Sequence, residues 1–214
     1  MPEKTTSNGA KTFLKKFASL EEKLAKKIKP QKRKLTITIS GETQVGKTIV
    51  GKILSSFFKL KLYNVGDRQR EFAQKKKLSL EKASRFLPQK IDFLMDKECL
   101  EMAVKGGYVL VGRLSGVAAG SWASCRILIV CQLKTRARRM SLKLKIPFKK
   151  ALAKIKERDK EDRRRHKELY GVDPVFKKFY NLIIDNTKPT LSQLKKLVIK
   201  KVKLCLKQQK LNQG

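Results

Sequence analysis

The chain has 214 residues, with 53 Lys and Arg against 18 Asp and Glu, and a formal net charge of +35. This length suits one domain with a sizeable core, and a hydrophobic content of 41% with a mean hydropathy of −0.43 argues against a wholly disordered chain. Apolar runs are too short for a transmembrane helix, and the polar, Lys-rich start gives no secretory signal, so we expect a cytoplasmic protein.

Cysteine and histidine usage restricts the chemistry. The four cysteines lie far apart, without the spacing of a metal clamp or redox motif, and are expected to be free thiols in a reducing compartment: Cys99, Cys125, Cys131 and Cys205. The single histidine, His166, argues against a His-based metal site and against a Ser–His–Asp hydrolase. Any chemistry must therefore rest on Lys, Arg, Asp and backbone amides.

The positive charge favours polyanionic partners, namely nucleotides, RNA, DNA or an acidic membrane surface. Residues 1–34 hold 11 Lys and Arg with 3 acids, residues 133–170 hold 16 with 5, and residues 190–214 hold 7 with none. An enzyme for a small anionic substrate needs only a few of these cations. The surplus therefore requires a separate explanation.

Residues 1–33 are predicted to form a basic N-terminal arm that is partly disordered or helical. Between Lys11 and Ile28, apolar residues recur at three- and four-residue spacing on a Lys-rich helix that Pro30 ends. Two interpretations remain open for this helix. It either folds onto the body of the domain or lies on RNA, a membrane or a partner.

The body of the chain, residues 34–208, alternates predicted strands and helices, and residues 209–214 form a tail. Strands are expected at 35–40, 61–65, 108–111, 126–131 and 182–184. Helices are expected at 48–60, over 68–104 with a break at Pro88, from 134 to 170 with a break near Ile146–Pro147, and at 191–208. This alternation predicts an α/β fold, a parallel sheet covered on both faces in a three-layer sandwich.

The segment between the first strand and the first helix of the body carries the strongest motif. It fits G-x-x-x-x-G-K-[ST], the P-loop, in which backbone N–H groups and a helix N-terminus cradle phosphates. We expect Lys47 to reach the β- and γ-phosphates of ATP, and the Thr48 hydroxyl to hold Mg²⁺. The predicted donor-binding residues are Gly41, Glu42, Thr43, Gln44, Val45, Gly46, Lys47 and Thr48.

Five ordered pieces of the chain resemble the cytidylate kinase family, particularly its archaeal-type branch, within the P-loop nucleoside-monophosphate kinase fold. They are Gly41–Thr48, Gly66–Arg70, Gly112–Gly116, Arg158–Arg165, and Tyr170–Asp173 ahead of Leu182–Thr187. The resemblance implies a (d)CMP kinase that transfers the ATP γ-phosphoryl group to CMP or dCMP. It also implies a helical monophosphate-binding insertion at 68–104 and an Arg-rich lid at 145–170.

The resemblance assigns roles to residues outside the P-loop. Arg70 and Arg113 correspond to the groups that grip the acceptor phosphate, and Asn64 lies near the acceptor nucleotide. On the lid, Arg158 and Arg165 resemble the arginines that close over the transferring phosphoryl group, with Lys47 as the third catalytic residue. Asp162 resembles the acidic lid residue that helps to hold the acceptor. Spacings of four and three residues place the three lid side chains on one helix face.

Four positions depart from the family pattern. Val111 stands where the family has an acidic residue that orients Mg²⁺ through water, a loss expected to reduce turnover on the order of 10- to 100-fold. Asn64 replaces Ser, Gln69 replaces an aromatic residue and Gln44 replaces a P-loop glycine. Three hypotheses follow: a working (d)CMP kinase, a basic and catalytically weakened relative bound to RNA or the ribosome, or an assembly factor that uses the nucleotide as a switch.

Overall fold

The computed structural model describes residues 19, 22–23, 26, 34–75 and 89–211. Most of the expected N-terminal helix, the expected break at Pro88 and the last residues of the tail lie outside these described residues. Within the described parts of the chain, no helix is both long and apolar enough to cross a membrane.

A five-stranded, fully parallel sheet forms the centre of the domain, in the order β2-β3-β1-β4-β5. Its strands are β1 (Thr36–Ser40), β2 (Lys61–Asn64), β3 (Tyr108–Val111), β4 (Cys125–Val130) and β5 (Leu182–Asp185). Each lies within one or two residues of an expected strand, so the predicted α/β sandwich with a parallel sheet is confirmed. In the central strand β1, all five residues are buried, including both threonines and Ser40.

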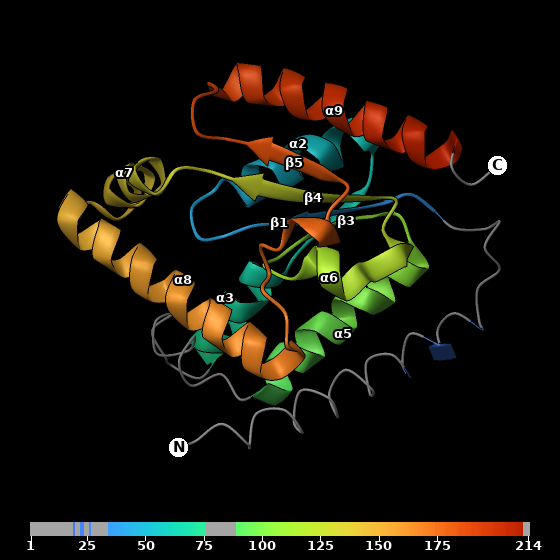
Figure 1. The fold of residues 1–214 in the computed structure, drawn as a ribbon, viewed down its shortest axis with the longest axis horizontal. Coiled ribbons are helices and arrows are strands. Elements are labelled where there is room, and N and C mark those ends of the chain that lie inside the picture. The colour runs from blue at the N-terminus through green and yellow to red at the C-terminus, as the bar shows by residue number, and fades with distance from the viewer. Residues whose placement is uncertain (1–18, 20–21, 24–25, 27–33, 76–88, 212–214) are drawn as a thin grey trace.

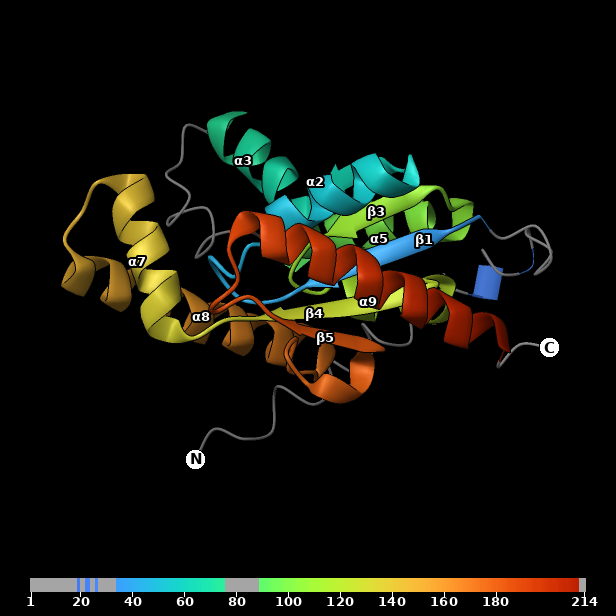
Figure 2. The ribbon, with the colours of Figure 1, turned by 90° about the horizontal axis from the view of Figure 1, so that it is seen from above.

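Helices cover both faces of the sheet (Figure 1). One layer holds α2 (Lys47–Phe58) and α9 (Leu191–Leu211), which contact each other, and Figure 2 shows α9 crossing over the strands. The opposite layer holds α5 (Gln89–Lys105), the short α6 (Ser115–Ala119) and a 3-10 turn at Gly120–Trp122. The short helix α6 and this 3-10 turn were not predicted.

Two apolar clusters hold the layers together. Between the sheet and the α2–α9 layer, fully buried side chains such as Ile39, Leu54 and Val198 pack against one another. On the other face, Leu100, Leu110 and residues of α6 form the second cluster with Trp122. The burial of the three middle strands β1, β3 and β4 explains why these strands are short, apolar and rich in β-branched residues.

The remaining helices lie near the carboxyl ends of the strands. Helix α3 (Val65–Lys75) directly follows β2 and begins three residues before the expected insertion. Helices α7 (Leu133–Leu144) and α8 (Phe148–Tyr170) form a hairpin on the side toward which β4 points (Figure 1). The predicted break lies between them, and Gly171, with a φ of 69°, ends α8. Ligands of open parallel sheets bind outside this edge.

Matched leucine substitutions test where the core lies. Leu54→Ala, at a side chain with 0% exposure, is expected to lower the free energy of unfolding by roughly 2–5 kcal/mol because it leaves a cavity. Leu142→Ala, at a side chain that is 81% exposed on α7, should change it by no more than about 0.5 kcal/mol. Urea unfolding followed by circular dichroism measures both; equal losses would contradict this placement of the core.

Candidate active site

The P-loop connects β1 to α2 at the carboxyl edge of the sheet. Gly41 and Gly46 have φ values of 145° and 99°, which side chains rarely adopt. A Cβ atom on Gly41 would lie 2.4 Å from the Ile129 carbonyl oxygen, and one on Gly46 would lie 2.4 Å from Asn186 Nδ2. Since α2 begins at Lys47, its unpaired N–H groups and the positive end of its dipole face the loop. This arrangement suits an anionic phosphate.

Lys47 occupies the loop in a way that leaves its charge available to a ligand. Its Nζ donates hydrogen bonds to the carbonyl oxygens of Gly41 and Glu42, both at 2.7 Å. Removal from water, together with the positive charges of Arg113 and Arg158, lowers the pKa of Lys47 well below its ordinary value. A bound phosphate would reverse this electrostatic penalty, so the site favours an anion beside this amine.

A cavity of about 330 Å³ opens beside the loop and gathers residues from distant segments. The P-loop, the end of β2, the start of α3, helix α5, the end of β3 and helix α8 all contribute to its lining. The residues predicted from the sequence that line this cavity are Thr43, Gln44, Gly46, Lys47, Thr48, Asn64, Arg70, Arg113 and Arg158. The structure therefore brings most of the residues singled out from the sequence to one cavity. The other predicted site residues are not among those that line it; they are Gly41, Glu42, Val45, Asp162 and Arg165.

Arg113 is positioned by the end of β3 and by two polar contacts. Its NH2 donates to Thr43 Oγ1 at 2.7 Å, and its NH1 forms an ion pair with Asp162. Burial, followed by the neighbouring charge of Arg158, lowers the pKa of Arg113. The guanidinium group thus links the P-loop to α8 at the cavity wall.

The three residues of α8 that were predicted to act in a lid have different surroundings. Arg158 lines the cavity, whereas Arg165 and Asp162 are buried and joined to each other at 3.1 Å. Arg165 Nε also lies 2.7 Å from Asp92 Oδ2, so this pair connects α8 to α5. Arg70 is half-exposed and paired with Asp67 on α3, yet it also lines the cavity.

A second set of ion pairs, which was not predicted, holds α7 and α8 against the P-loop. Arg136 NH1 lies 2.6 Å from Asp159 Oδ2, and Arg136 NH2 lies 3.2 Å from Glu42 Oε2. The Thr43 amide also donates to Asp159 Oδ1 at 3.3 Å, and Arg163 pairs with Glu42 at 2.5 Å. Only the density of arginines in α7 and α8 could have indicated this set, because nothing local fixes its partners.

Buried carboxylates form another part of the cavity wall that sequence reasoning missed. Asp92 and Asp96 are one helical turn apart on α5 and are only 5% and 8% exposed. Burial raises the pKa of both carboxyl groups. The pKa of Asp96 rises to about 7, and the neighbouring charge of Asp92 contributes to this rise. The Tyr170 hydroxyl donates a hydrogen bond to Asp96. His166 on α8 completes this wall of the cavity, and burial lowers its pKa. The spacing of these acids on a helix was the only available signal.

The Thr48 hydroxyl is exposed to the cavity and accepts a hydrogen bond from Asn64 Nδ2 at 3.3 Å. Asn64 Oδ1 in turn accepts from the Gly66 amide at 3.1 Å, which ties the end of β2 to the start of α3. No cluster of three or more His, Cys, Asp or Glu side chains in the described ranges could hold a metal ion. The hydroxyl therefore suits Mg²⁺ only in combination with nucleotide phosphates and water.

The departures from the family pattern have visible structural consequences. The side chain of Val111 is 1% exposed and packs in the core cluster next to Gly51, so the end of β3 presents no carboxylate at this position. Gln44 has a φ of 60°, a conformation that glycine adopts with less strain. Gln69 lies within α3, and its side chain is outside the described atoms.

This combination of a parallel sheet, a P-loop after its central strand and arginines converging on one cavity defines the chain as a P-loop kinase. The profile of the Cytidylate kinase-like family matches residues 36–188. The chain therefore belongs to this family and is an enzyme of the nucleoside-monophosphate kinase class.

Individual relatives agree with this assignment. The chain is 33% identical to a cytidylate kinase of Pyrococcus horikoshii over 159 residues, which are 73% of this chain and 82% of that protein. It is 32% identical to a cytidylate kinase of Methanopyrus kandleri over 165 residues, covering 72% and 86% of the two chains.

Solved structures show the same fold. An uncharacterized protein from Eubacterium ventriosum superposes with a TM-score of 0.63 at 20% identity, covering 79% of this chain and 99% of the other. A shikimate kinase from Acinetobacter baumannii, solved in complex with shikimate, gives a TM-score of 0.55 at 14% identity, with coverage of 82% and 94%.

The raised pKa of Asp96 predicts a specific pH dependence of stability. The folded protein holds a proton on Asp96 up to a pH of about 7, whereas the unfolded chain releases it near pH 4. The stabilisation due to this proton is therefore present at low pH and is lost as pH rises toward 7. The unfolding free energy of the wild type, relative to Asp96→Asn, should fall by up to about 1.4 kcal/mol per pH unit over this range.

Urea unfolding of both proteins at several pH values measures this difference directly. Asp185→Asn, which removes an exposed carboxylate at the end of β5, serves as the control. A pH-independent difference between wild type and Asp96→Asn would show that Asp96 is ionised in the fold.

Proposed function

We propose that this protein is a cytoplasmic kinase that transfers the γ-phosphoryl group of ATP to CMP or dCMP, producing CDP or dCDP. The observation that carries the proposal is the single cavity that P-loop residues share with Arg70, Arg113 and Arg158. Phosphoryl transfer requires positioning and neutralisation of charge rather than a protein nucleophile, and these residue types supply both.

On the donor side, the amides of Gly41–Thr48 would hold the ATP phosphates at the start of α2. Lys47 would exchange its two carbonyl partners for the outer phosphate oxygens, whose negative charge would offset the burial and the charge repulsion that lower its pKa. Thr48 would hold Mg²⁺ together with the phosphates, and the ion would neutralise part of their negative charge. Arg158, in the same cavity, would add a further positive charge.

On the acceptor side, Arg70 and Arg113 would bind the monophosphate, since a guanidinium group can grip two phosphate oxygens at once. Arg113 forms an ion pair with Asp162 in this structure. An incoming phosphate would therefore bind the guanidinium group of Arg113 beside this carboxylate. Arg165 would reach the transferring group only by leaving Asp92, which makes the lid segment 145–170 a moving part of the reaction.

The buried acids on α5 support cytosine over uracil. Asp92 lines the cavity and lies 2.7 Å from Arg165 Nε, so its carboxylate offers oxygen atoms that accept hydrogen bonds. Cytosine carries an exocyclic amino group that donates, whereas uracil has a carbonyl acceptor at the same position. An acceptor oxygen facing the Asp92 carboxylate would leave buried groups without partners, which is costly. The α5 wall therefore favours CMP and dCMP over UMP.

A substrate panel tests the proposal. Nuclease-treated protein is assayed for ATP-dependent phosphorylation of CMP, dCMP, UMP and AMP under identical conditions. CMP or dCMP is expected to react with a kcat/KM at least tenfold above that of UMP or AMP. A preference for a purine, or no turnover with any of the four, would contradict the assigned reaction.

Lys47→Ala is expected to reduce kcat on the order of 100-fold or more, because the developing charge on the outer phosphates loses its nearest cation. Lys143→Ala is the matched control, since this lysine also lines the cavity but lies on α7 away from the loop. Circular dichroism should show unchanged folding for both variants. Normal turnover by Lys47→Ala would remove the P-loop lysine from the mechanism.

Val111→Asp tests whether the missing carboxylate limits turnover. The substitution places an acid at the end of β3, next to the second turn of α2, and kcat per folded molecule is expected to rise. Val109→Asp is the control, because Val109 has the same burial on the same face but lies farther from the strand end. Both variants should lose stability by a few kcal/mol because a buried carboxylate is poorly solvated. A rise in kcat in both variants, or in neither of them, would contradict a role for position 111.

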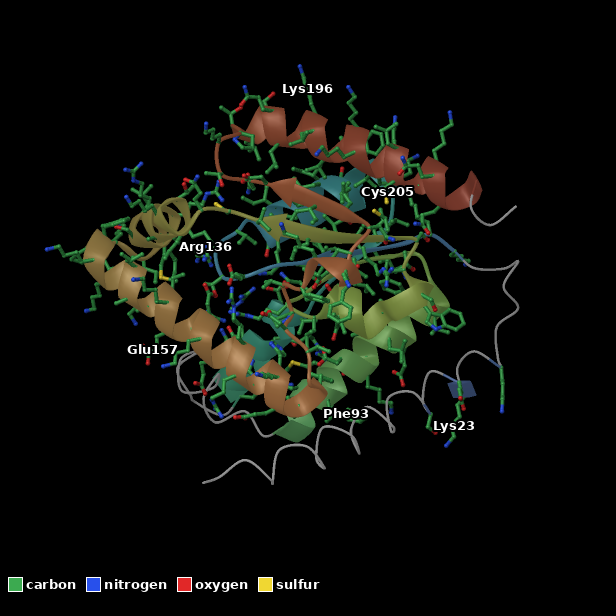
Figure 3. The ribbon with its side chains drawn as sticks, viewed as in Figure 1. Lys23, Phe93, Arg136, Glu157, Lys196 and Cys205 are labelled. Atoms are coloured by element: carbon green, nitrogen blue, oxygen red, sulfur yellow. The ribbon has the colours of Figure 1, made fainter. Side chains whose placement is uncertain are left out.

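A second candidate function, binding of RNA, is favoured by the outer face of α9. Six lysines on this helix are exposed, and α9 contains no acid; they are Lys195, Lys196, Lys200, Lys201, Lys203 and Lys207. Among the described residues, none of them has an ion-pair partner. Figure 3 shows Lys196 pointing away from the body of the domain. Exposed Phe57 on α2, with Lys203 Nζ 4.8 Å from its ring centroid, adds a surface on which a base could stack.

Four Lys→Gln substitutions at 196, 200, 203 and 207 test this surface. The slope of log K against log salt for single-stranded RNA is expected to fall by about 0.7 per lysine removed, with CMP phosphorylation unchanged. The same number of Lys→Gln changes at the exposed positions 149, 150, 156 and 160 of α8 controls for net charge. Equal slopes for the two variants, or binding to anionic vesicles but not to RNA, would reject the α9 face as an RNA site.

A further inference from the structure

Two cysteines that are distant in sequence meet between β4 and α9. The Cys125 thiol donates to Cys205 Sγ across a distance of 3.0 Å, although 80 positions separate the two residues. Cys125 is fully buried and Cys205 is 6% exposed, on the side of α9 that faces the sheet (Figure 3). Both belong to the core cluster that joins this helix to the strands.

Cys125 and Cys205 differ from the other two cysteines because their sulfur atoms are in contact. Cys99 is buried in the cluster on the opposite face of the sheet, and Cys131 lies beyond the carboxyl end of β4 next to Arg139. Only Cys125 and Cys205 contact each other among the four thiols, all of which are described. Their sulfur atoms need to approach from 3.0 Å to roughly 2.05 Å to bond.

We infer that Cys125 and Cys205 form a reversible intrachain disulfide that fastens α9 to β4 in the presence of a low-molecular-weight disulfide. Two thiols held in contact by separate elements of the core need only a short approach of their sulfur atoms to bond, and the oxidant reaches Cys205 when α9 opens locally from the sheet. The cross-link would close a large loop that contains β4, α7, α8 and β5, and would thereby restrict the unfolded chain. The inference is independent of the proposed kinase reaction.

The chemistry proceeds by two thiol–disulfide exchanges. The hydrogen bond from Cys125 lowers the pKa of Cys205 and raises that of Cys125, so Cys205 is the first nucleophile. Its thiolate attacks one sulfur of the oxidant RSSR and releases one RSH after protonation, leaving a mixed disulfide on Cys205. Cys125 then loses its proton, attacks Cys205 Sγ and releases the second RSH. The two cysteines lose two electrons in total, and the oxidant gains them.

The position of the pair predicts which properties change on oxidation. Cys125 pairs in register with Ile37 near the start of β1, whereas the P-loop follows the end of that strand. The cross-link therefore lies at the edge of the sheet opposite the cavity. Oxidation should raise the melting temperature by about 5–15 °C and leave the rate of CMP phosphorylation unchanged.

The experiment oxidises the full-length protein with oxidised glutathione and maps it by non-reducing peptide mass spectrometry. The expected product is a monomer with two of its four thiols left, in which the peptide of Cys125 is linked to that of Cys205. Dithiothreitol should restore the original thiol count and melting temperature. Four unreacted thiols, stable mixed glutathione adducts, or a link that involves Cys99 or Cys131 would overturn the inference.

Variants separate the pair from the other thiols. Cys99→Ser/Cys131→Ser should still lose two thiols and gain thermal stability on oxidation, whereas Cys205→Ala should do neither. The peptide map of the wild type answers the question even where a variant folds poorly. A melting temperature of Cys205→Ala that rises on oxidation as much as that of the wild type would also overturn the inference.

Discussion

The buried ion pairs between α8 and the P-loop are the interaction on which the rest of the site depends. Asp162 pairs with Arg113, and Asp159 receives both Arg136 and the Thr43 amide, so carboxylates of α8 hold the P-loop and the end of β3. Removing one partner from such a pair leaves a buried charge without compensation. The resulting loss of folding free energy is far larger than the stabilisation that an exposed ion pair provides. The cavity owes its shape to these contacts, because they fix α8 against the loop and the end of β3.

The same contacts prepare the site for an anion. The carboxylates keep several guanidinium groups within one small volume, where they would otherwise repel one another. Burial, followed by the charges of Arg113 and Arg158, lowers the pKa of Lys47. A phosphate that enters this cavity meets cations that are already positioned and only partly neutralised. Acids thus gather around the cavity, while the charged residues on the outer face of α9 are all lysines. This separation of charge explains how a chain of net charge +35 can contain a site rich in carboxylates.

The agreement between the expected and observed strands follows from local physics. A parallel strand buried on both faces must be short, apolar and β-branched, as Cys125–Val130 is, and the P-loop is contiguous in the chain. The Arg136–Asp159 and Glu42–Arg163 pairs were not foreseen, because their partners lie on separate elements and many arginines could have filled each place. The Asp92 and Asp96 wall was missed for a related reason, since acids on a helix more often face water.

The sequence alone determined the fold class, the phosphate loop and the family, because periodicity, β-branching and contiguous motifs depend on neighbouring residues. Only the tertiary structure decided which side chains meet. It placed Arg165 against Asp92, buried Val111 against Gly51, and brought Cys125 to within 3.0 Å of Cys205 although the cysteine spacing had suggested four unrelated thiols. Such contacts arise from the packing of helices on a sheet, where residues distant in the chain become neighbours and no local pattern records the distance between them.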